Sequence, residues 1–566
     1  MEYIKTLSVL EKVINVPIFS IIGSISKIPL YISTERGQIG LHALGKEPIR
    51  LTNAPVFEVA RPKPDADFVT FTRDTSRGKE LHSINIAALN GEEYEVYNAK
   101  TRITSLAYDG EKVAFISNSG GGGGLFLEEG GEAKKLSDIS PFSFVRDVGE
   151  KYVIGDGMLT GNPRSRELFV APLTGGKPEI FTPKEGSLNK AFEIQNESVY
   201  FTSDYETEGE ASRLYKFDLQ SRIYERIEFS GKDLGRYDPV EILQFELSSN
   251  LLIGGRDGET RIFRDGSMVK TPRGVVDGAT DIGGDIFFSH SSLNSPYRIL
   301  KADRRGKIRT VIANKRVGIG TVEYKKMRTD VTVPAWIVKP KNRASRIGIV
   351  MVHGGPWDSV DNRWDFAIAP FAMAGYTVIA PNFRGSTGYG SRFMQMDIND
   401  AGGGDLRDVI SSRDYLVKNK IVDHVGIMGG SYGGFMTFLA TAKYPELWEF
   451  GIAIAGAPDW EEMKDLSDPW FKTFIGMLFG NNTELMKDRS AKNFVANVKA
   501  PLCIIHSQND SRTPLMPVLR YVQKLQELDR RFEMHVIPDM GHTITSMRDA
   551  VDLLFPALAF LEKLYH

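Results

Sequence analysis

The stretch that decides the fold of the C-terminal half is His424-Val425-Gly426-Ile427-Met428-Gly429-Gly430-Ser431-Tyr432-Gly433-Gly434. Its beginning is an apolar run typical of a buried strand, and residues 435–440 beyond it are compatible with a helix. A serine flanked by glycines between a strand and a helix predicts a sharp turn that lifts the serine oxygen clear of the backbone. The glycines are required because side chains there would collide.

Further apolar runs recur around this stretch and alternate with helical patterns. Near-continuous apolar runs are typical of strands that are buried on both faces of a parallel sheet. We therefore expect a doubly wound α/β domain with a mostly parallel sheet over residues 321–566. The runs lie at residues 346–352, 376–380, 424–428, 450–455 and 502–506.

Residues 21–320 instead contain short β-patterned runs separated by Gly, Pro, Asn and Asp turns. The runs recur roughly every 40 residues, a period that fits propeller blades of four strands. Seven such units predict an all-β, seven-bladed propeller, although the spacing alone leaves six or eight blades open. The runs begin near Leu30, Phe68, Lys112, Tyr152, Ser198, Leu251 and Asp285.

The first 20 residues stand apart from both halves. Tyr3, Leu7, Leu10 and Ile14 recur at helical spacing in an otherwise polar segment. They predict one amphipathic helix whose apolar stripe is buried against another part of the chain. We expect it to pack on the α/β half rather than on the propeller.

Composition narrows the possible function classes. The 566 residues exceed what one hydrophobic core supports, so at least two domains are expected. The 70 basic and 72 acidic residues give a net charge of −2 without long like-charge blocks, which argues against nucleic-acid and membrane-surface binding. No signal peptide or membrane span is apparent, so we expect a cytoplasmic protein. The single cysteine, Cys503, excludes internal disulfides and Cys-rich metal sites.

Ser431 needs a base and an orienting acid to act as a nucleophile. Of the four later histidines, His542 is best placed because it follows a loop after a β-patterned run, whereas His506 and His535 lie within such runs and His566 is terminal. Asp510 follows the run that ends at His506 and precedes the base, as the chain order serine, acid, base requires. The other candidate acids fit less well: Asp539 is too close to the base, and no strand precedes Asp459, Asp465 and Asp468.

The oxyanion formed during attack needs two backbone donors. Tyr432 N–H supplies one by its place after the serine. Gly355, in the loop His353-Gly354-Gly355-Pro356 after an apolar run, is expected to supply the other, although a simple turn is an alternative there. We expect His353 to be structural, and no metal or organic cofactor, because the protein itself activates the nucleophile.

Five motifs now resemble the prolyl oligopeptidase family in order and spacing, and within it the acylaminoacyl peptidases. The resemblance implies a seven-bladed propeller that caps an α/β-hydrolase domain and excludes folded proteins. It also implies removal of an N-acylated amino acid from short peptides. The motifs are His353-Gly354-Gly355-Pro356, residues 382–390, residues 429–434, residues 509–514 and Gly541-His542.

The resemblance also suggests substrate-binding residues. Arg512 matches the family arginine that holds a substrate carbonyl, with a surface ion pair as the alternative. Trp460, Phe471 and Phe474 lie where the family builds the pocket for the residue before the scissile bond (S1), or else belong to the core. Glu80, in a loop of the second blade, either faces the hydrolase and pairs with Arg512 or is a solvated loop charge.

Two other functions stay open: a broad carboxylesterase that acts on small esters, and a propeller interaction protein with a vestigial hydrolase half. A dipeptidyl-peptidase-like enzyme would need a pair of propeller glutamates for the free amine, and no such pair can be placed. The expected partners are short N-acylated peptides and further copies of the chain in a homo-oligomer.

Overall fold

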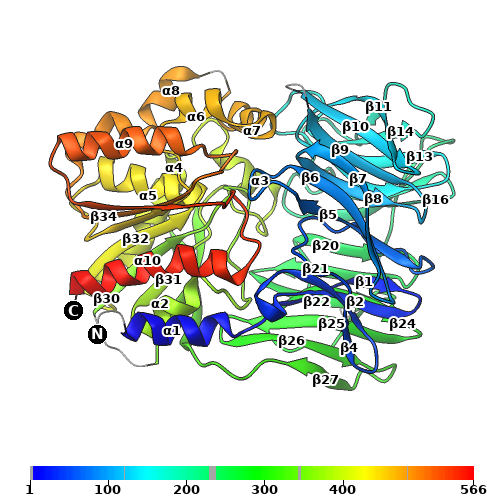
Figure 1. Ribbon diagram of the computed structural model, residues 1–566, viewed down its shortest axis with the longest axis horizontal. Coiled ribbons are helices and arrows are strands. Elements are labelled where there is room, and N and C mark those ends of the chain that lie inside the picture. The colour runs from blue at the N-terminus through cyan, green and yellow to red at the C-terminus, as the bar shows by residue number, and fades with distance from the viewer. Residues whose placement is uncertain (1–3, 120–121, 229–236, 342–345, 481, 566) are drawn as a thin grey trace.

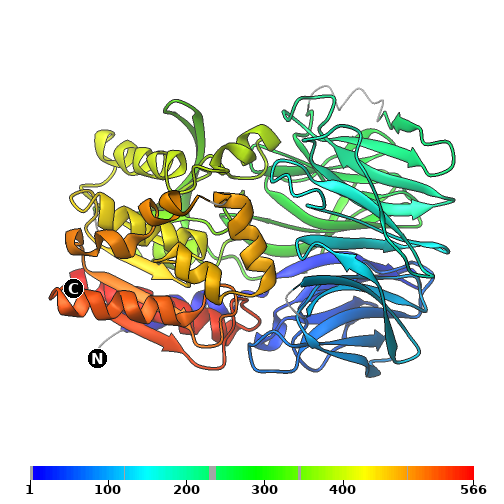
Figure 2. The ribbon, with the colours of Figure 1, turned by 90° about the horizontal axis from the view of Figure 1, so that it is seen from above.

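The computed structural model describes residues 4–119, 122–228, 237–341, 346–480 and 482–565. The chain forms two domains that lie side by side, an α/β domain and a β-propeller (Figures 1 and 2). Helix α1 (Ile4–Ile14) lies beside the α/β domain, although the chain then builds the whole propeller before returning to it (Figure 1).

Seven antiparallel sheets form the propeller within the described residues. Each blade is one contiguous segment of the chain, and its strands pair in chain order with their neighbours antiparallel. A short 3₁₀ helix, η1 (Glu35–Gly37), interrupts the first blade. The blades are β1 (Phe19–Ile25), β2 (Ile28–Ser33), β3 (Gly40–Leu44) and β4 (Pro48–Arg50); β5 (Phe68–Asp74), β6 (His82–Ala88) and β7 (Glu93–Thr101); β8 (Ile103–Tyr108), β9 (Val113–Ser119), β10 (Gly122–Glu129) and β11 (Glu132–Ile139); β12 (Ser143–Val148), β13 (Tyr152–Gly157), β14 (Glu167–Pro172) and β15 (Glu179–Phe181); β16 (Asn189–Gln195), β17 (Ser198–Ser203), β18 (Arg213–Asp218) and β19 (Tyr224–Arg226); β20 (Glu241–Glu246), β21 (Leu251–Arg256), β22 (Glu259–Arg264) and β23 (Ser267–Val269); β24 (Val275–Ile282), β25 (Asp285–Ser292), β26 (Ser295–Ala302) and β27 (Ile308–Ala313).

The second blade is completed by an irregular inner segment, residues 57–60. Phe57 N–H donates to the Thr72 carbonyl at 3.0 Å, and Thr72 N–H donates to the Glu58 carbonyl at 2.8 Å. This segment therefore takes the inner position that β1, β8 and the corresponding strands take in the other blades, and it carries Glu58 toward the propeller axis.

The propeller ring closes by packing between its first and last blades. Strand β1 packs against β24 and β25, and Ile21 N–H donates to Ser289 Oγ at 3.2 Å. A side chain at Gly278 would overlap the Ile21 carbonyl oxygen, so the two backbones touch there. Within the described residues, no strand pairing joins the first and last blades.

The α/β domain has one sheet with the strand order β28-β29-β31-β30-β32-β33-β34-β35. Strands β28 and β29 are antiparallel to their neighbours, and the strands from β31 to β35 pair in parallel. One face is covered by α4, α5 and α9, and the other by α1, α2 and α10. The elements are β28 (Gly320–Arg328), β29 (Thr332–Pro340), β30 (Ile347–Val352), α2 (Ile368–Ala374), β31 (Thr377–Pro381), α3 (Ser391–Met394), η2 (Gln395–Asp397), α4 (Gly404–Lys418), β32 (His424–Gly430), α5 (Tyr432–Lys443), β33 (Gly451–Ile454), α6 (Trp460–Leu466), α7 (Pro469–Phe479), α8 (Thr483–Asp488), η3 (Ala491–Asn497), β34 (Leu502–Ser507), α9 (Leu515–Glu527), β35 (Phe532–Ile537) and α10 (Met547–Tyr565).

Helix α1 packs on α10 and α2 of the α/β domain (Figure 1). Its predicted apolar stripe is wrong in part, because Leu7 is 55% exposed, while Tyr3 lies outside the described residues. The buried face instead includes Val9, Leu10 and Val13. Thr6 is buried as well, and its Oγ1 donates to Glu562 Oε2 of α10 at 2.5 Å.

Candidate active site

The serine lies at a strained turn between β32 and α5. Ser431 has φ 54° and ψ −115°, a conformation that costs free energy and that the surrounding packing must maintain. The glycines around it allow close backbone approach: a side chain at Gly429 would lie 2.5 Å from the Gly433 carbonyl carbon, and one at Gly433 would overlap the Val352 carbonyl. The turn therefore presents Ser431 at the carboxyl edge of the sheet.

Two loops at the same edge bring the acid and the base to Ser431. Asp510 follows β34 and His542 follows β35. His542 Nε2 lies 3.0 Å from Ser431 Oγ, and His542 Nδ1 lies 2.6 Å from Asp510 Oδ2. The three side chains predicted from the sequence thus form one hydrogen-bonded chain, in the geometry by which a histidine activates a serine.

Asp510 is held ionised although it is buried. Burial opposes the charge, but the His542 charge and hydrogen bond, with further donors, lower the Asp510 pKa to about 2. Arg512 N–H and Thr513 N–H donate to Oδ1 at 3.0 and 2.8 Å, and Thr513 Oγ1 lies 2.9 Å from Oδ2. A carboxylate in this state holds Nδ1 of the base protonated and leaves Nε2 free to accept the serine proton. Buried His506 does not contact the serine: its Nε2 lies 2.6 Å from the Thr513 carbonyl.

The loop predicted to complete the oxyanion hole lies against the nucleophile. A side chain at Gly354 would lie 3.6 Å from Ser431 Cβ, and Gly355 has φ 109°. The amide N–H groups of Gly355 and Tyr432 have no acceptor among the described residues. Tyr432 is the first residue of α5, and the N–H groups in the first turn of a helix have no partner within the helix. His353 is structural, since it stacks on Phe383 at 4.2 Å and its Nδ1–H donates to the Gly354 carbonyl at 2.7 Å.

Both oxyanion segments are anchored to a pair of buried carboxyl groups. The Tyr432 hydroxyl donates to Asp405 Oδ2, and Trp357 Nε1, two residues after Gly355, donates to Asp397 Oδ1 at 3.2 Å. Burial raises the Asp405 pKa to about 6 and raises the Asp397 pKa well above its usual value. These contacts fix the orientation of the two segments that carry the predicted oxyanion donors.

The predicted S1 residues divide into two groups. Trp460 is a core residue: it is fully buried and packs against Phe435 and Phe479 at ring distances of 4.8 and 5.0 Å. Phe474 instead meets the ring of Trp357 at 5.6 Å, next to the oxyanion loop, and packs beside Phe471 at 5.3 Å.

The propeller adds a ring to this aromatic cluster. Phe142 lies 6.3 Å from the ring of Trp357 and 4.9 Å from that of Trp470 on helix α7. Sequence reasoning did not identify Phe142, Trp357 or Trp470 as site residues, because no local pattern links a propeller strand to the oxyanion loop.

Arg512 is joined to the propeller by a network of charges. Its Nη2 lies 3.0 and 3.1 Å from the two oxygens of Glu80, whose side chain is only 2% exposed. Arg102, which the sequence did not single out, pairs with Glu80 at 3.1 Å and with Asp468 at 2.7 Å. Glu80 is therefore not a solvated loop charge. Its neighbouring arginines lower its pKa although burial opposes this.

The loop that carries Glu80 is also in close backbone contact with the loop that carries His542. Gly78 has φ +89°, and a side chain there would lie 2.5 Å from the Gly541 amide nitrogen. Asn509 Nδ2 donates to the Arg77 carbonyl at 2.9 Å. A cavity of about 300 Å³ opens beside this contact, lined by Glu80, Gly541 and Thr543 among others.

Comparison with known proteins identifies the relatives of both domains. Residues 30–300 match the N-terminal domain of acylamino-acid-releasing enzyme-like proteins, and residues 362–566 match the prolyl oligopeptidase family. The C-terminal part of the chain thus matches the model of the prolyl oligopeptidase family, and the propeller part matches the domain found in acylamino-acid-releasing enzyme-like proteins. These matches confirm the resemblance to acylaminoacyl peptidases and the two-domain architecture expected from the motifs.

Among curated relatives, the acylamino-acid-releasing enzyme of Rattus norvegicus is 26% identical over 41% of this chain and 34% of its own length. The dipeptidyl aminopeptidase BIII of Pseudoxanthomonas mexicana is 30% identical over 34% of this chain and 30% of its own length. The chain thus matches about a third of these relatives. The solved acylaminoacyl peptidase of Pyrococcus horikoshii has the same fold, with a TM-score of 0.71 at 17% identity over 97% of this chain and 95% of that one.

Two features are absent from the described residues. No helix there is long and apolar enough to cross a membrane. No group of three or more His, Cys, Asp or Glu side chains there is arranged to hold a metal ion.

Proposed function

We propose that this protein is a serine exopeptidase that removes an N-acylated amino acid from the N-terminus of short peptides. The observation that carries the proposal is the hydrogen bonding of the Arg512 guanidinium group, which lies beside the triad. Its Nε is buried without a hydrogen-bond partner among the described residues, while Nη2 is held by Glu80 and Thr543. A buried unpaired donor is costly, and the carbonyl oxygen of an acyl group would satisfy it.

The surroundings of Glu80 support blocked rather than free N-termini. Its carboxylate forms an ion pair with Arg102 and accepts hydrogen bonds from Arg512 and Thr543. A carboxylate already paired with two guanidinium groups offers little to a substrate amine.

The chemistry follows from the positions of the side chains. Ser431 Oγ attacks the carbonyl carbon of the N-acylated residue while His542 Nε2 takes its proton, and the amide N–H groups of Tyr432 and Gly355 stabilise the oxyanion. His542 then returns the proton to the leaving amine, which frees the shortened peptide and leaves an acyl-enzyme. Water, deprotonated by the same nitrogen, hydrolyses the ester and regenerates Ser431.

A second candidate is an aminopeptidase that acts on free N-termini, and one side chain favours it. The Glu58 carboxylate lines the propeller cavity and forms no ion pair with a described residue. Burial raises its pKa, which the charges of Arg102 and Arg512 oppose. An ammonium group would complement this carboxylate. A broad carboxylesterase is a third candidate, since the same triad cleaves activated esters.

One experiment separates these functions. We would measure p-nitroaniline release from acetyl-phenylalanine and phenylalanine anilides, beside hydrolysis of a p-nitrophenyl ester, with Ser431→Ala as the blank. Faster cleavage of the acetylated anilide, abolished in the variant, is the expected result. Faster cleavage of the free anilide would establish the aminopeptidase instead, and ester turnover alone would establish an esterase.

We further propose a cytoplasmic homo-oligomer, as the sequence led us to expect. Light scattering of the purified protein tests the assembly: a mass of 63.1 kDa would identify a monomer and contradict this expectation.

A further inference from the structure

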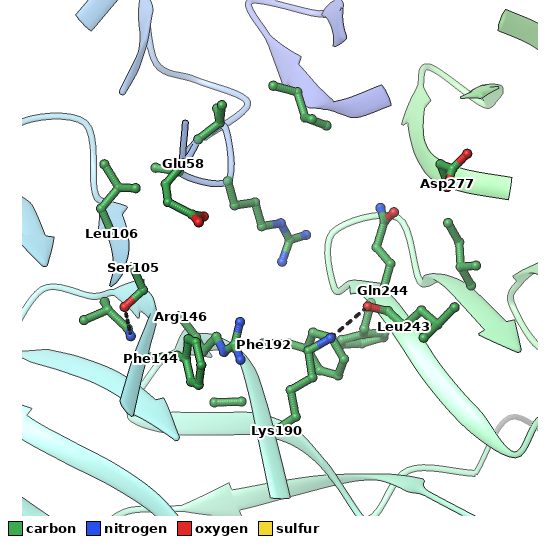
Figure 3. Close-up of a pocket in the computed structure, with 18 of the residues that line it drawn as sticks. Glu58, Ser105, Leu106, Phe144, Arg146, Lys190, Phe192, Leu243, Gln244 and Asp277 are labelled. Atoms are coloured by element: carbon green, nitrogen blue, oxygen red, sulfur yellow. Dashed lines mark hydrogen bonds between the residues drawn. The ribbon is translucent and has the colours of Figure 1, made fainter. Parts of the chain in front are cut away.

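A cavity of about 690 Å³ lies along the propeller axis, and every blade contributes to its wall. Six charged side chains line it: Glu58, Arg61, Arg146, Lys190, Asp277 and, from the α/β domain, Arg363. Figure 3 shows Glu58, Arg146 and Lys190 extending into the same space from different blades. A cavity with charged walls selects its occupants by charge as well as by size.

Most of these charges are neutralised within the protein. Arg61 pairs with Glu193, and Arg363 pairs with Asp277 at 2.8 Å. Arg146 pairs with Asp156 at 2.8 Å but shares it with Arg166, so one positive charge remains at this pair of arginines. Two are not paired with any described residue of opposite charge, the carboxylate of Glu58 and the ammonium of Lys190.

Lys190 is a cation that forms no ion pair with a described residue, although the charges of Asp156 and Glu241 act on it from farther away. Its Nζ donates one hydrogen bond, to the Leu243 carbonyl at 3.2 Å (Figure 3), and lies 5.2 Å from the ring centre of Phe192. An ammonium has three donors, so two of them stay available to a ligand. Burial lowers the Lys190 pKa to about 8, and most molecules therefore still carry the charge at pH 7.

A row of side chains connects this cation with the catalytic site. The ring of Trp357 lies 6.3 Å from that of Phe142, which lies 5.7 Å from Phe144. Arg146 then stacks on Phe144 at 5.0 Å, and it acts electrostatically on Lys190. Phe142 directly precedes β12, and Arg146 lies four residue steps further along the chain, roughly 13 Å at the rise of a strand. The ring distance from Trp357 to Phe142 adds 6.3 Å, so an extended peptide of about six residues would span this path.

We propose that Lys190, with Arg146 beside it, binds the C-terminal carboxylate of short peptide substrates. The inference rests on the proposed function, because a peptide with an acylated N-terminus and neutral side chains carries its only charge at that carboxylate. The cavity would then select for a free peptide end, which a folded protein does not present at this depth.

Glu58 also favours binding of the substrate carboxylate at Lys190, because Glu58 disfavours it near Arg512. Its carboxylate interacts with Arg102 and Arg512 of the catalytic network. It repels a second carboxylate, so the charged end of a substrate is directed away from Arg512 and toward Lys190.

The test compares acetyl-Phe-Ala-Ala-Ala-Ala-Ala-Ala with its C-terminal amide. The six alanines span the path to Lys190, and the two peptides differ only in the terminal charge. We expect the wild type to cleave the acid with a kcat/KM about tenfold higher, the size of one charge-assisted hydrogen bond in a wet cavity. In Lys190→Met the ratio falls to near one, and in Lys190→Arg it is retained. Lys216→Met, in strand β18 of the same blade but outside the cavity, keeps the wild-type ratio.

An acid-to-amide ratio near one in the wild type, or a ratio unchanged by Lys190→Met, would overturn the inference. A ratio within one enzyme is insensitive to partial misfolding, since both substrates meet the same folded fraction. Acetyl-phenylalanine anilide, which has no carboxylate, reports on the proposed function separately. If it is cleaved while the ratio is one, only this inference fails, and if no acetylated substrate is cleaved, both fail.

Discussion

The substitution Gly78→Ala in the propeller is expected to impair catalysis, because the added methyl group displaces the loop of His542. Residue 78 itself need not contact the substrate for this effect. The added Cβ would lie 2.5 Å from the Gly541 amide nitrogen and 2.7 Å from the Met540 carbonyl carbon, both backbone atoms. Ordinary contact begins at 3.4 Å, so the two loops must separate by about 0.9 Å. Gly541 precedes His542, and displacing a catalytic group by about 1 Å costs about a hundredfold in rate.

Gly91→Ala provides a matched control. Gly91 lies in the turn after β6 with φ +85°, close to the +89° of Gly78, but no atom lies within 4 Å of its added Cβ. Both variants pay about 1–2 kcal/mol for an L-residue at positive φ. Only Gly78→Ala also displaces the histidine loop.

The assay measures kcat/KM for a p-nitrophenyl ester and for acetyl-phenylalanine anilide, beside thermal unfolding. We expect Gly78→Ala to lose about a hundredfold on both substrates, and Gly91→Ala to keep wild-type rates with a slightly lower unfolding temperature. Equal rates in the two folded variants would refute the idea that the propeller loop positions His542.

Two further predictions concern the charges of the site. The first is a double-mutant cycle of Glu80→Gln and Arg512→Met, in which peptide cleavage should fall more than ester cleavage. We expect a coupling energy of about 2 kcal/mol for this buried pair. Additive effects would show that the two side chains act independently. The Asp510 pKa is lowered to about 2, so its charge stabilises the fold above the unfolded-state pKa of 3.8 and this contribution, about 2 kcal/mol, is lost as pH falls through 2. The difference in unfolding temperature between the wild type and Asp510→Asn should therefore shrink from pH 5 to pH 2, and a constant difference would contradict this.

The sequence predicted the elements whose signal is local. Strands such as β32 are continuous apolar runs because both sheet faces are covered, and the elbow at Ser431 needs glycines for backbone contacts a few residues away. The predicted propeller runs are mostly the second strands of the blades, which are buried between neighbouring blades and are therefore the most apolar. In the second blade the predicted run is β5, because residues 57–60 form the irregular strand inside it.

The sequence did not predict contacts whose partners are distant in the chain. Arg102 pairs with Asp468, 366 positions away, and nothing in the residues around either one indicates the other. The face of α1 was misassigned for the same reason, since Leu7 and Leu10 are equally apolar and only the position of α10 decides which is buried. Strand β28 was not identified because it is mostly half-buried and lacks an apolar run. Strand β29 does contain a buried apolar run, residues 333–338, and was overlooked although this signal is local.

Because no strand pairing among the described residues joins the first and last blades, the α/β domain helps to hold the propeller ring closed. Helix α1 is anchored on α10 and α2 just before β1, and β28 joins the α/β sheet just after β27, so both ends of the ring are held by the same body. The α/β domain thus connects the first and last blades, which no strand pairing among the described residues joins directly. Widening the seam at Ile21 and Gly278 would strain both attachments, and the rigidity of the ring is therefore a property of the whole chain.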